Sequence, residues 1–415
     1  MRRVAVTGIG VLSPIGHTTF EVIENACNGR SGVGLLQTPF SHRLLSPLAA
    51  TVKFNAQDHF DPPKLRMLDR VSQFALVAAK QALIDSGIDT TTIDRDRAGV
   101  FMGTAMGGSL SNDDGYKTLY GDKSDRIKPF TVLLGMHNAP ATWIGIEYGL
   151  LGPNITYSTA CSSSSVAIGE AWLRISSGSQ EFALAGGSEA PLSFGSLKAW
   201  EALNTLAAVD PDEPSASCRP FAKNRSGMVI GEGAVMLVLE PLDDAVKRSA
   251  KIYGEVIGYG NTTDAGHITR PSVEGQANAM RAALKSASIN TLGINAINAH
   301  GTGTQLNDAI ETAAIKSVFG SQAFNIPISA TKAIHGHLLG AAGALECALS
   351  LLAMQHNVAL PTVHLHVRDA DCDLDYVPNS VRHLDIIDTM LSNSFAFGGT
   401  NVTLVLRKHG NHPFH

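Results

Sequence analysis

The segment STACSSSSVAIG, residues 158–169, places a cysteine directly before four consecutive serines. Serine is poor in a helix interior and good at a helix start, because its side chain competes for backbone donors. The segment therefore predicts a strand, a sharp turn and a helix start, with Cys161 at the turn. A thiol there faces unpaired N–H groups and the positive end of the helix dipole, which favour the thiolate. Cys161 is thus a candidate nucleophile, although a lone cysteine is as often a small buried apolar residue.

Three further segments place reactive side chains near predicted strand ends. His300 lies in NAHGTGTQLND, Lys332 and His337 lie in ATKAIHGHLLG, and Phe397 lies in the glycine-rich NSFAFGGTN. Active sites of α/β sheets collect in loops at the carboxyl ends of strands, so these loops and the Cys161 turn are expected to converge. Each histidine could instead be a core residue satisfied by backbone groups, and Lys332 a solvated charge. A cysteine beside histidines fits acyl transfer through a covalent acyl-enzyme.

Short apolar runs alternate with helical stretches along the chain, the pattern of sheets covered by helices in an α/β protein. The predicted strands are residues 3–7, 99–103, 154–158, 182–185, 234–239, 252–259, 296–299, 326–329, 389–393 and 402–406. The predicted helices are residues 70–86, 163–176, 275–286, 308–319 and 338–355.

Two pairs of segments resemble each other in the same order along the chain. NITYSTACSSSSVAIGEAWLRI resembles NIPISATKAIHGHLLGAAGALECAL, and GEGAVMLVLE resembles GGTNVTLVLR. Either pair alone could be chance, but together they predict a duplication with its seam near Ser249. The first half, residues 1–249, then carries the cysteine, and the second half, residues 250–415, carries the histidines and the lysine.

The composition excludes several classes of protein. The 415 residues are 44% hydrophobic and 17% charged with a net charge of −5, which fits a globular protein and gives no reason to expect nucleic acid or an anionic membrane as a partner. The five cysteines lack CxxC spacing, which argues against a disulfide scaffold or a zinc site and for a reducing compartment. The longest apolar run, residues 338–354, contains Glu346 and is interpreted as a buried helix. We therefore expect a cytoplasmic protein without a metal site.

The motifs TACSSS, HGTGT, KxxxGH and NSFxFGGTN, in this order over essentially the whole chain, resemble those of the type I/II β-ketoacyl-acyl-carrier-protein synthases. These are condensing enzymes of the thiolase superfamily. The resemblance implies a duplicated five-layer αβαβα fold with two mixed sheets, and a homodimer. It also implies an acyl carrier protein as partner and no bound cofactor, since the substrates are carried on the partner's phosphopantetheine arm.

The resemblance also implies roles for individual residues. Cys161 would accept the acyl chain as a thioester. His300 and His337 would stabilise the enolate formed when malonyl-carrier protein loses CO2, and Lys332 would order them. The amides of Cys161 and Phe397 would form the oxyanion hole, and Phe397 would gate the pocket. The implied substrate-binding residues are Thr302, Thr304, Met106, Phe395 and Thr131, and the expected carrier-docking residues are Lys64, Arg66, Arg70, Arg126 and Lys128.

Other functions remain open at this stage. TACSSSS and HGTGTQLND are closer to polyketide ketosynthases than to housekeeping synthases, so an alternative is a polyketide or aryl-polyene ketosynthase, either alone or paired with a chain-length factor. A cysteine-dependent acyl hydrolase is a remote alternative, which Lys332 and a second histidine argue against. A dinucleotide-binding oxidoreductase is weakly suggested by TGIGVLSPIG, where Ser13 replaces the third glycine of the fingerprint. A non-enzymatic subunit conflicts with the complete cysteine and histidine set.

Overall fold

The computed structural model describes residues 1–410, so residues 411–415 at the end of the predicted second half lie outside the described residues. One sheet contains ten strands: β1 (Val4–Leu12), β4 (Ala98–Gly103), β5 (Asn154–Tyr157), β6 (Phe182–Glu189), β7 (Gly233–Pro241), β8 (Gly254–Thr263), β9 (Ala296–Asn298), β10 (Ile328–Ser329), β13 (Thr389–Phe395) and β14 (Thr400–Arg407). Two small sheets pair β2 (Val33–Leu35) with β3 (Leu48–Ala50) and β11 (Val358–Ala359) with β12 (Arg382–His383).

Thirteen α-helices complete the described part of the chain. They are α1 (Thr19–Cys27), α2 (Pro62–Leu65), α3 (Arg70–Ser86), α4 (Ser109–Tyr116), α5 (Thr131–Gly135), α6 (Ala139–Tyr148), α7 (Ser163–Ser176), α8 (Phe194–Ala202), α9 (Leu242–Lys247), α10 (Val273–Ala287), α11 (Gln305–Phe319), α12 (Lys332–His335) and α13 (Ala342–His356). All ten predicted strands coincide with strands of the large sheet, and the five predicted helices coincide with α3, α7, α10, α11 and α13.

The strand order shows the duplication directly. In the large sheet it is β10-β9-β13-β14-β8-β1-β7-β6-β4-β5, so each half repeats one five-stranded pattern outward from the centre. The segments that echo each other in sequence occupy equivalent places: β7 matches β14, and β5 with α7 matches β10 with α13. Each half mixes parallel and antiparallel pairs, as expected. The predicted seam near Ser249 stays a prediction.

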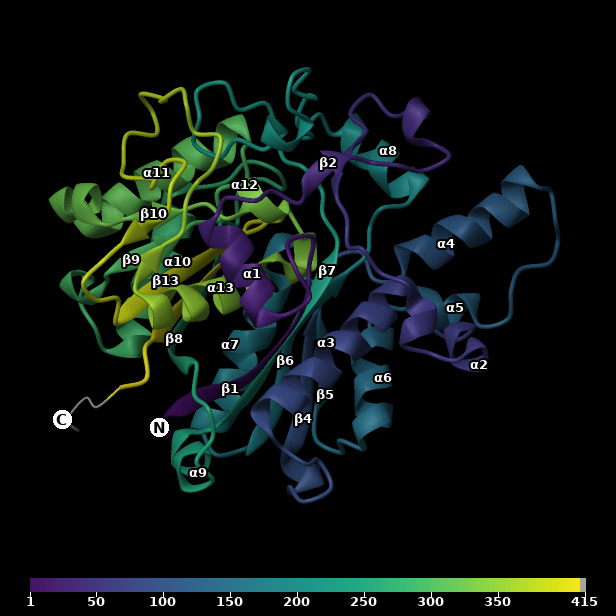
Figure 1. The fold of residues 1–415 in the computed structure, drawn as a ribbon, viewed down its shortest axis with the longest axis horizontal. Helices are drawn as coiled ribbons and strands as arrows, with labels where there is room; N and C mark the ends of the chain where they lie inside the picture. The colour runs from purple at the N-terminus through teal and green to yellow at the C-terminus, as the bar shows by residue number, and fades with distance from the viewer. Residues whose placement is uncertain (411–415) are drawn as a thin grey trace.

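The two mixed halves of the sheet lie on either side of a central pair of helices. Helix α7 packs against β4 and β6 of one half and against β14 and β8 of the other, and α13 likewise touches both halves. Helices α3 and α6 cover the outer face of the first half, and α10 covers that of the second with α11 beside it (Figure 1). Five layers result. The halves join along β1 and β8 through three residue pairs, which makes their hydrogen bonding continuous.

Close backbone contact brings the central helices against the strands that end at the reactive loops. Gly103 is the last residue of β4, and a methyl group there would stand 2.3 Å from the backbone nitrogen of Ser164 in α7. Gly343 in α13 would similarly collide with the hydroxyl of Ser165 at 2.0 Å. Glycine at these two positions therefore allows the first turn of α7 to pack directly against β4 and α13.

The segment between β4 and β5 was not predicted as helical, because its helices are short and partly exposed. Figure 1 shows α4 and α5 at one side of the molecule, away from the central layers. Strand β5 forms one edge of the large sheet, and among the described residues it pairs only with β4. Within residues 1–410 no helix combines the length and the apolar character needed to span a bilayer.

Gly103→Ala is expected to lower the free energy of unfolding by about 1–3 kcal/mol, because the added methyl group forces α7 away from β4. Urea denaturation monitored by circular dichroism measures the change. The matched control is Gly34→Ala in β2, where no atom lies within 4 Å of the added methyl group. Equal stability of the two variants would contradict the close contact at Gly103.

Candidate active site

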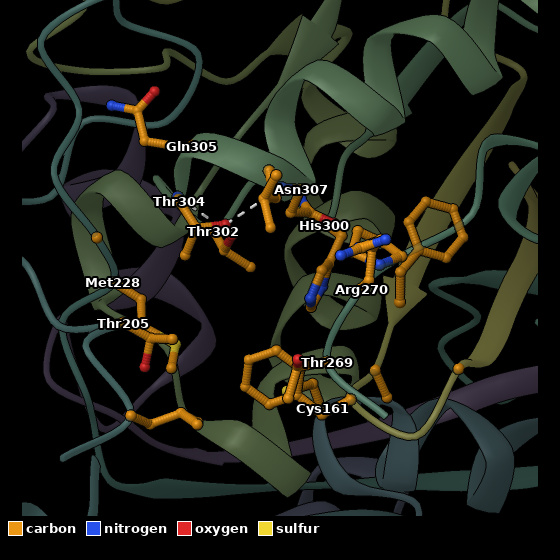
Figure 2. Close-up of a pocket in the computed structure, with 18 of the residues that line it drawn as sticks. Cys161, Thr205, Met228, Thr269, Arg270, His300, Thr302, Thr304, Gln305 and Asn307 are labelled. Carbon is orange, nitrogen blue, oxygen red and sulfur yellow. Dashed lines mark hydrogen bonds between the residues drawn. The ribbon is translucent and has the colours of Figure 1, made fainter. Parts of the chain in front are cut away.

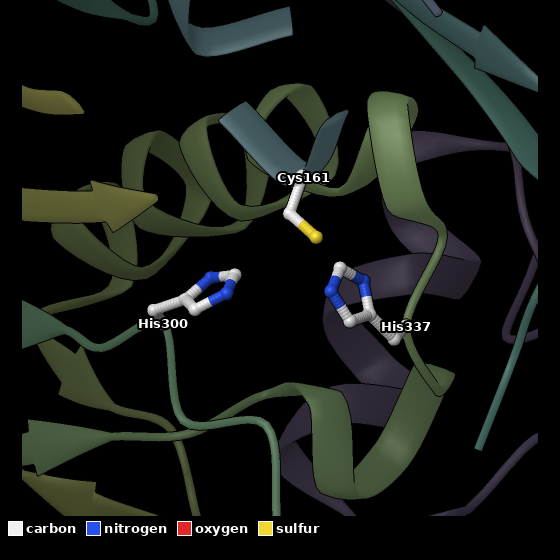
Figure 3. A group of neighbouring side chains, drawn as sticks. All are labelled: Cys161, His300 and His337. Carbon is white, nitrogen blue, oxygen red and sulfur yellow. The ribbon is translucent and has the colours of Figure 1, made fainter. Parts of the chain in front are cut away.

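The four predicted loops meet around one cavity of about 360 Å³ (Figure 2). Cys161, His300, His337 and Phe397 all line it, together with Phe395 and the two threonines of HGTGT. The Cys161 sulfur and one ring nitrogen of each of His300 and His337 lie within 4.8 Å of one another (Figure 3). The sequence expectation that these side chains converge is therefore matched by their placement.

Cys161 lies in a tight turn directly before α7. The preceding residue, Ala160, has a φ of +50°, a left-handed conformation that L-residues rarely adopt and that turns the chain sharply. The four following serines are fully buried, and they form hydrogen bonds both within the turn and to other elements. Ser163 Oγ accepts the Thr159 N–H at 2.9 Å, whereas Ser164 Oγ accepts the N–H of Ala344 in α13 at 2.9 Å. The serine run therefore also joins the two central helices.

The Cys161 thiol is buried, which opposes the thiolate that the helix start was expected to favour. Burial raises the pKa of Cys161 to about 11, while the Lys332 charge and the backbone amide of Phe397 act to lower it. The helix N-terminus was expected from the sequence to favour the thiolate. That expectation did not include the larger effect, which is the desolvation of that anion.

His300 is fixed by a buried lysine behind it. Lys332 Nζ donates to the His300 carbonyl at 2.7 Å, lies 3.2 Å from His300 Nδ1, and forms an ion pair with Glu346. A lysine ammonium can only donate, so Nδ1 must accept and the imidazole proton is on Nε2. Lys332 does not line the cavity, and the ordering role that was expected of it stays a prediction.

His337 has the same tautomer for a different reason. The N–H of Leu339 donates to His337 Nδ1 at 3.1 Å, which leaves the proton on Nε2. This buried Nε2 has no hydrogen-bond partner among the described residues. An unpaired buried donor is costly, so a ligand acceptor is expected there. His335, in the same turn, instead lies 3.1 Å from the Thr331 hydroxyl.

Both imidazoles of the site are neutral. Burial and the Lys332 charge hold the pKa values of His300 and His337 well below the usual histidine range. The rings meet edge to face with their centroids 5.4 Å apart. The cavity thus holds two neutral N–H donors opposite one sulfur.

The same tautomers argue against a metal ion at this Cys-His-His set. A ligating histidine binds through an unprotonated nitrogen and usually donates its other N–H to a carboxylate or carbonyl group. Here His337 Nδ1 accepts a backbone N–H instead, and the nitrogen that carries the proton is the unpartnered one. The expectation of no metal site stays a prediction, supported by this hydrogen-bond pattern.

Buried acids that the sequence analysis missed hold the HGTGT loop in place. Glu311 accepts the N–H groups of His300 and Gly301, both at 2.8 Å. Asp308 accepts those of Thr302 at 3.1 Å and Gly303 at 3.2 Å. The Thr302 and Thr304 hydroxyls lie 2.8 Å apart at the cavity wall. The pairing of Glu346 had a signal in the sequence: this acid interrupts a long apolar helix, so it needs a buried cation as partner, and that cation is Lys332.

The Phe397 loop closes one side of the cavity. The Phe397 ring stacks on Trp200 with centroids 6.1 Å apart, and it belongs to an apolar cluster that includes Met106. Met106 does not line the cavity itself. Its amide is held by Glu189, a fully buried carboxylate whose pKa burial raises to about 7. Thr131 lies in α5, away from the cavity, and its hydroxyl donates to the Lys128 carbonyl.

The predicted docking residues differ in their surroundings. Arg70 donates to the buried Glu232 and to the Val52 carbonyl. Lys64 pairs with Glu147 and Lys128 with Asp114, both on the surface. Arg66 and Arg126 are exposed, and their side chains make no hydrogen bond or ion pair with the described residues.

A duplicated five-layer α/β fold whose repeats jointly enclose a cysteine and two histidines defines a condensing enzyme of the thiolase-like class. The family models agree: the β-ketoacyl synthase N-terminal domain matches residues 1–245 and the C-terminal domain matches residues 253–366. The chain belongs to the β-ketoacyl synthase family.

Curated relatives match along nearly the whole chain. The 3-oxoacyl-[acyl-carrier-protein] synthase 2 of Staphylococcus aureus (strain COL) is 39% identical over 410 residues, covering 98% of each protein. Nodulation protein E of Rhizobium meliloti (strain 1021) is 41% identical over 407 residues, covering 98% of this chain and 99% of that protein. Both alignments include all four motif segments.

Solved structures confirm the fold. A type II polyketide ketosynthase, AntDE bound to a hexaketide in complex with its acyl-carrier protein AntF, superposes with a TM-score of 0.91 at 33% identity. The ishigamide ketosynthase/chain length factor gives the same TM-score and identity. In both cases the match covers 99% of this chain and 100% of the other.

Alkylation of Cys161 by iodoacetamide is expected to accelerate about tenfold per pH unit from pH 7 to pH 9 without a plateau. The reason is that a pKa near 11 leaves the thiolate a small fraction that grows tenfold with each unit. Peptide mass spectrometry measures the rate. A plateau near neutral pH would mean that the helix start outweighs burial.

Proposed function

We propose that the chain extends an acyl group by two carbons, with Cys161 as nucleophile and His300 and His337 as enolate-stabilising donors. The observation that carries this proposal is the pair of neutral imidazoles, whose Nε2 protons are available to a ligand beside the Cys161 sulfur. A condensing enzyme needs two such donors for a developing negative charge, in addition to a nucleophile.

In the first half-reaction the sulfur of Cys161 attacks the carbonyl carbon of an acyl thioester on the carrier arm. A new C–S bond forms to Cys161, the bond to the arm sulfur breaks, and the arm leaves as a thiol with the proton that Cys161 gives up. The oxygen of the tetrahedral intermediate accepts from the amides of Cys161 and Phe397. The Phe397 amide already faces the sulfur and lowers its pKa.

In the second half-reaction a malonyl thioester loses CO2. The C–C bond to the carboxylate breaks, and its electron pair moves to the thioester oxygen, giving an enolate held by the two Nε2–H donors. The enolate carbon then attacks the acyl thioester on Cys161, and the Cys161 sulfur leaves and takes a proton from solvent. The products are CO2 and a β-ketoacyl thioester two carbons longer.

This chemistry uses a thiol, N–H donors and the substrates' own thioesters, so we propose that the enzyme binds no cofactor of its own. The substrates would be carried on the phosphopantetheine arm of an acyl carrier protein, with the Thr302 and Thr304 hydroxyls available to the arm. A carrier partner is supported by the similar ketosynthase AntDE, which is in complex with its acyl-carrier protein AntF. All five cysteines are free thiols, which supports a reducing, cytoplasmic location.

We propose that an acidic carrier protein docks on basic surface residues. Of the five expected residues, Arg66 and Arg126 are the best placed, because their charges are not used inside the described structure. Lys64 and Lys128 would first have to leave exposed ion pairs, which are weak. Arg70 is held by a buried carboxylate and contributes least.

A dimer is supported by the surface around the edge strand β5. Large apolar side chains of the surrounding segment are exposed: Tyr116, Tyr120, Ile127, Phe130, Val132, Leu133, Met136, Ile146 and Leu151. An open sheet edge beside such a surface is typical of a protein interface. We propose a homodimer, in which Thr131 could reach a partner's pocket. The alternative of a polyketide or polyene ketosynthase paired with a chain-length factor would use the same surface. The ishigamide ketosynthase/chain length factor is a pair of this kind among the similar structures.

Mixing the enzyme with acyl-carrier proteins of graded chain length is expected to add one acyl mass to the wild type and none to Cys161→Ala, because the chain is transferred to that sulfur. Intact-protein mass spectrometry measures the adduct. The matched control is Cys27→Ala, which removes another free thiol and retains the adduct. Malonyl-carrier protein is then expected to discharge it.

Other outcomes distinguish the alternatives. An adduct that persists in Cys161→Ala contradicts the nucleophile, and one that water discharges without malonyl-carrier protein indicates the acyl hydrolase. Loading by long saturated chains favours fatty acid elongation. Loading by unsaturated or aryl chains alone favours the polyketide or polyene pathway.

His300→Ala and His337→Ala are each expected to slow decarboxylation of malonyl-carrier protein roughly 100-fold or more, because each removes one donor to the enolate. Release of CO2, measured in a Cys161→Ala background, isolates this step. In the same background the rate is expected to stay constant between pH 8 and pH 6, since the lowered pKa values keep both imidazoles neutral. The control His383→Ala changes an exposed histidine in β12. A fall in rate toward pH 6 would contradict the neutral histidines.

A further inference from the structure

Arg270 is the only lysine or arginine among the described residues that line the active-site cavity. Figure 2 shows it among the side chains drawn around that cavity. It is exposed and lies in the loop between β8 and α10. An unpaired guanidinium at the entrance of a partly apolar cavity, whose one carboxylate is already hydrogen-bonded within the protein, indicates that an anion binds there.

The burial of the lining residues gives the direction of the cavity. Cys161 is 5% exposed and His337 is 1% exposed, so they form its floor. Leu203, Leu306 and Ile268 also line it, yet they are 43%, 58% and 73% exposed, so they form its rim. The channel therefore runs from the surface at Arg270 and Ile268 down to the sulfur.

The proposed function fixes which end of the substrate lies at the rim. A thioester must reach Cys161, whereas the carrier protein at the other end of the arm is too large to enter. The arm is joined to that protein by a phosphodiester, so this group is the anion that must stay near the rim. A malonyl carboxylate is only two bonds from its thioester carbonyl. It therefore lies near Cys161 at the floor of the cavity and not at the rim.

No described residue competes for Arg270. Its side chain makes no hydrogen bond or ion pair with any of residues 1–410. The one carboxylate that lines the cavity, Asp264, already accepts from Asn401 Nδ2 at 2.7 Å and from the Ser272 N–H at 3.2 Å. The guanidinium is therefore available to a ligand.

The loop that carries Arg270 is tied to the Phe397 loop. The Gly398 N–H donates to the Ile268 carbonyl at 2.7 Å, and the Asp264 N–H donates to the Gly399 carbonyl at 2.9 Å. Pro271 restricts the backbone directly after Arg270. These contacts hold the backbone of the loop that carries Arg270 at the entrance before a ligand arrives, which reduces the entropy lost on binding.

We propose that Arg270 binds the phosphodiester of the carrier's phosphopantetheine arm at the mouth of the channel. This assignment rests on the proposed function and adds a recognition residue for the arm. Charge-assisted hydrogen bonds from arginine to phosphate are stronger than neutral ones, and at a partly exposed site we expect an effect of about tenfold on affinity.

The test uses S-butyl thioethers of phosphopantetheine and of pantetheine, which differ only in the phosphate and cannot transfer an acyl group. Isothermal titration calorimetry measures both dissociation constants. The wild type is expected to bind the phosphorylated compound about tenfold more tightly. Arg270→Ala is expected to remove this preference and leave the affinity for the pantetheine compound unchanged, and Arg270→Lys to keep part of it.

The matched control is Arg368→Ala, which removes an exposed arginine from a second cavity elsewhere on the surface and is expected to keep the preference. An unchanged preference in Arg270→Ala, equal affinities in the wild type, or an equal loss for both compounds would overturn the proposal. The readout needs no catalysis. If the wild type prefers the phosphorylated compound but Cys161 is not acylated by acyl-carrier proteins, the phosphate-binding role of Arg270 stands and the proposed reaction is refuted.

Discussion

The buried ion pair between Lys332 and Glu346 is the interaction on which the site depends. Both side chains are 1% exposed, so removing either partner would leave an uncompensated charge in the core. The same ammonium reaches the carbonyl and Nδ1 of His300. One lysine thus links α13, the turn before it and the HGTGT loop. Its charge also helps to keep His300 and His337 neutral and opposes the effect of burial on Cys161.

The duplicated architecture explains how such a lysine can be buried. Helices α7 and α13 meet between the two halves of the sheet, and the turn before each helix points into the same space. The first repeat places Cys161, the proposed nucleophile, at this turn, and the second repeat places Lys332 and His337 at the equivalent turn. Buried serines fix α7 in place, because Ser164 Oγ accepts the N–H of Ala344 in α13 and the Ser165 hydroxyl lies 2.8 Å from that of Ser394 in β13.

The elements of the sheet could be predicted from the sequence because buried strands and long helices have a clear pattern of apolar residues. The short helices α4, α5 and α8 have no such pattern and depend on tertiary contacts. Cys161, His300, Lys332 and His337 were found because each follows a predicted strand in a turn of small residues. The buried acids Glu311 and Asp308 were not found, since a carboxylate that accepts backbone N–H groups looks like any surface acid in the sequence. The raised pKa of Cys161 could not be predicted from the sequence either, because desolvation depends on the packing around the sulfur.

The tautomers of the two histidines have a consequence for the lifetime of the reactive carbanion. A neutral imidazole N–H can hydrogen-bond an enolate, but it is a far weaker acid than an imidazolium and does not hand over its proton. In the proposed reaction the enolate is therefore stabilised without being quenched. A charged histidine at the same place would convert it to a simple acetyl thioester, and the chain would release CO2 without growing. The depressed basicity of His300 and His337 thus protects carbon–carbon bond formation from a futile side reaction.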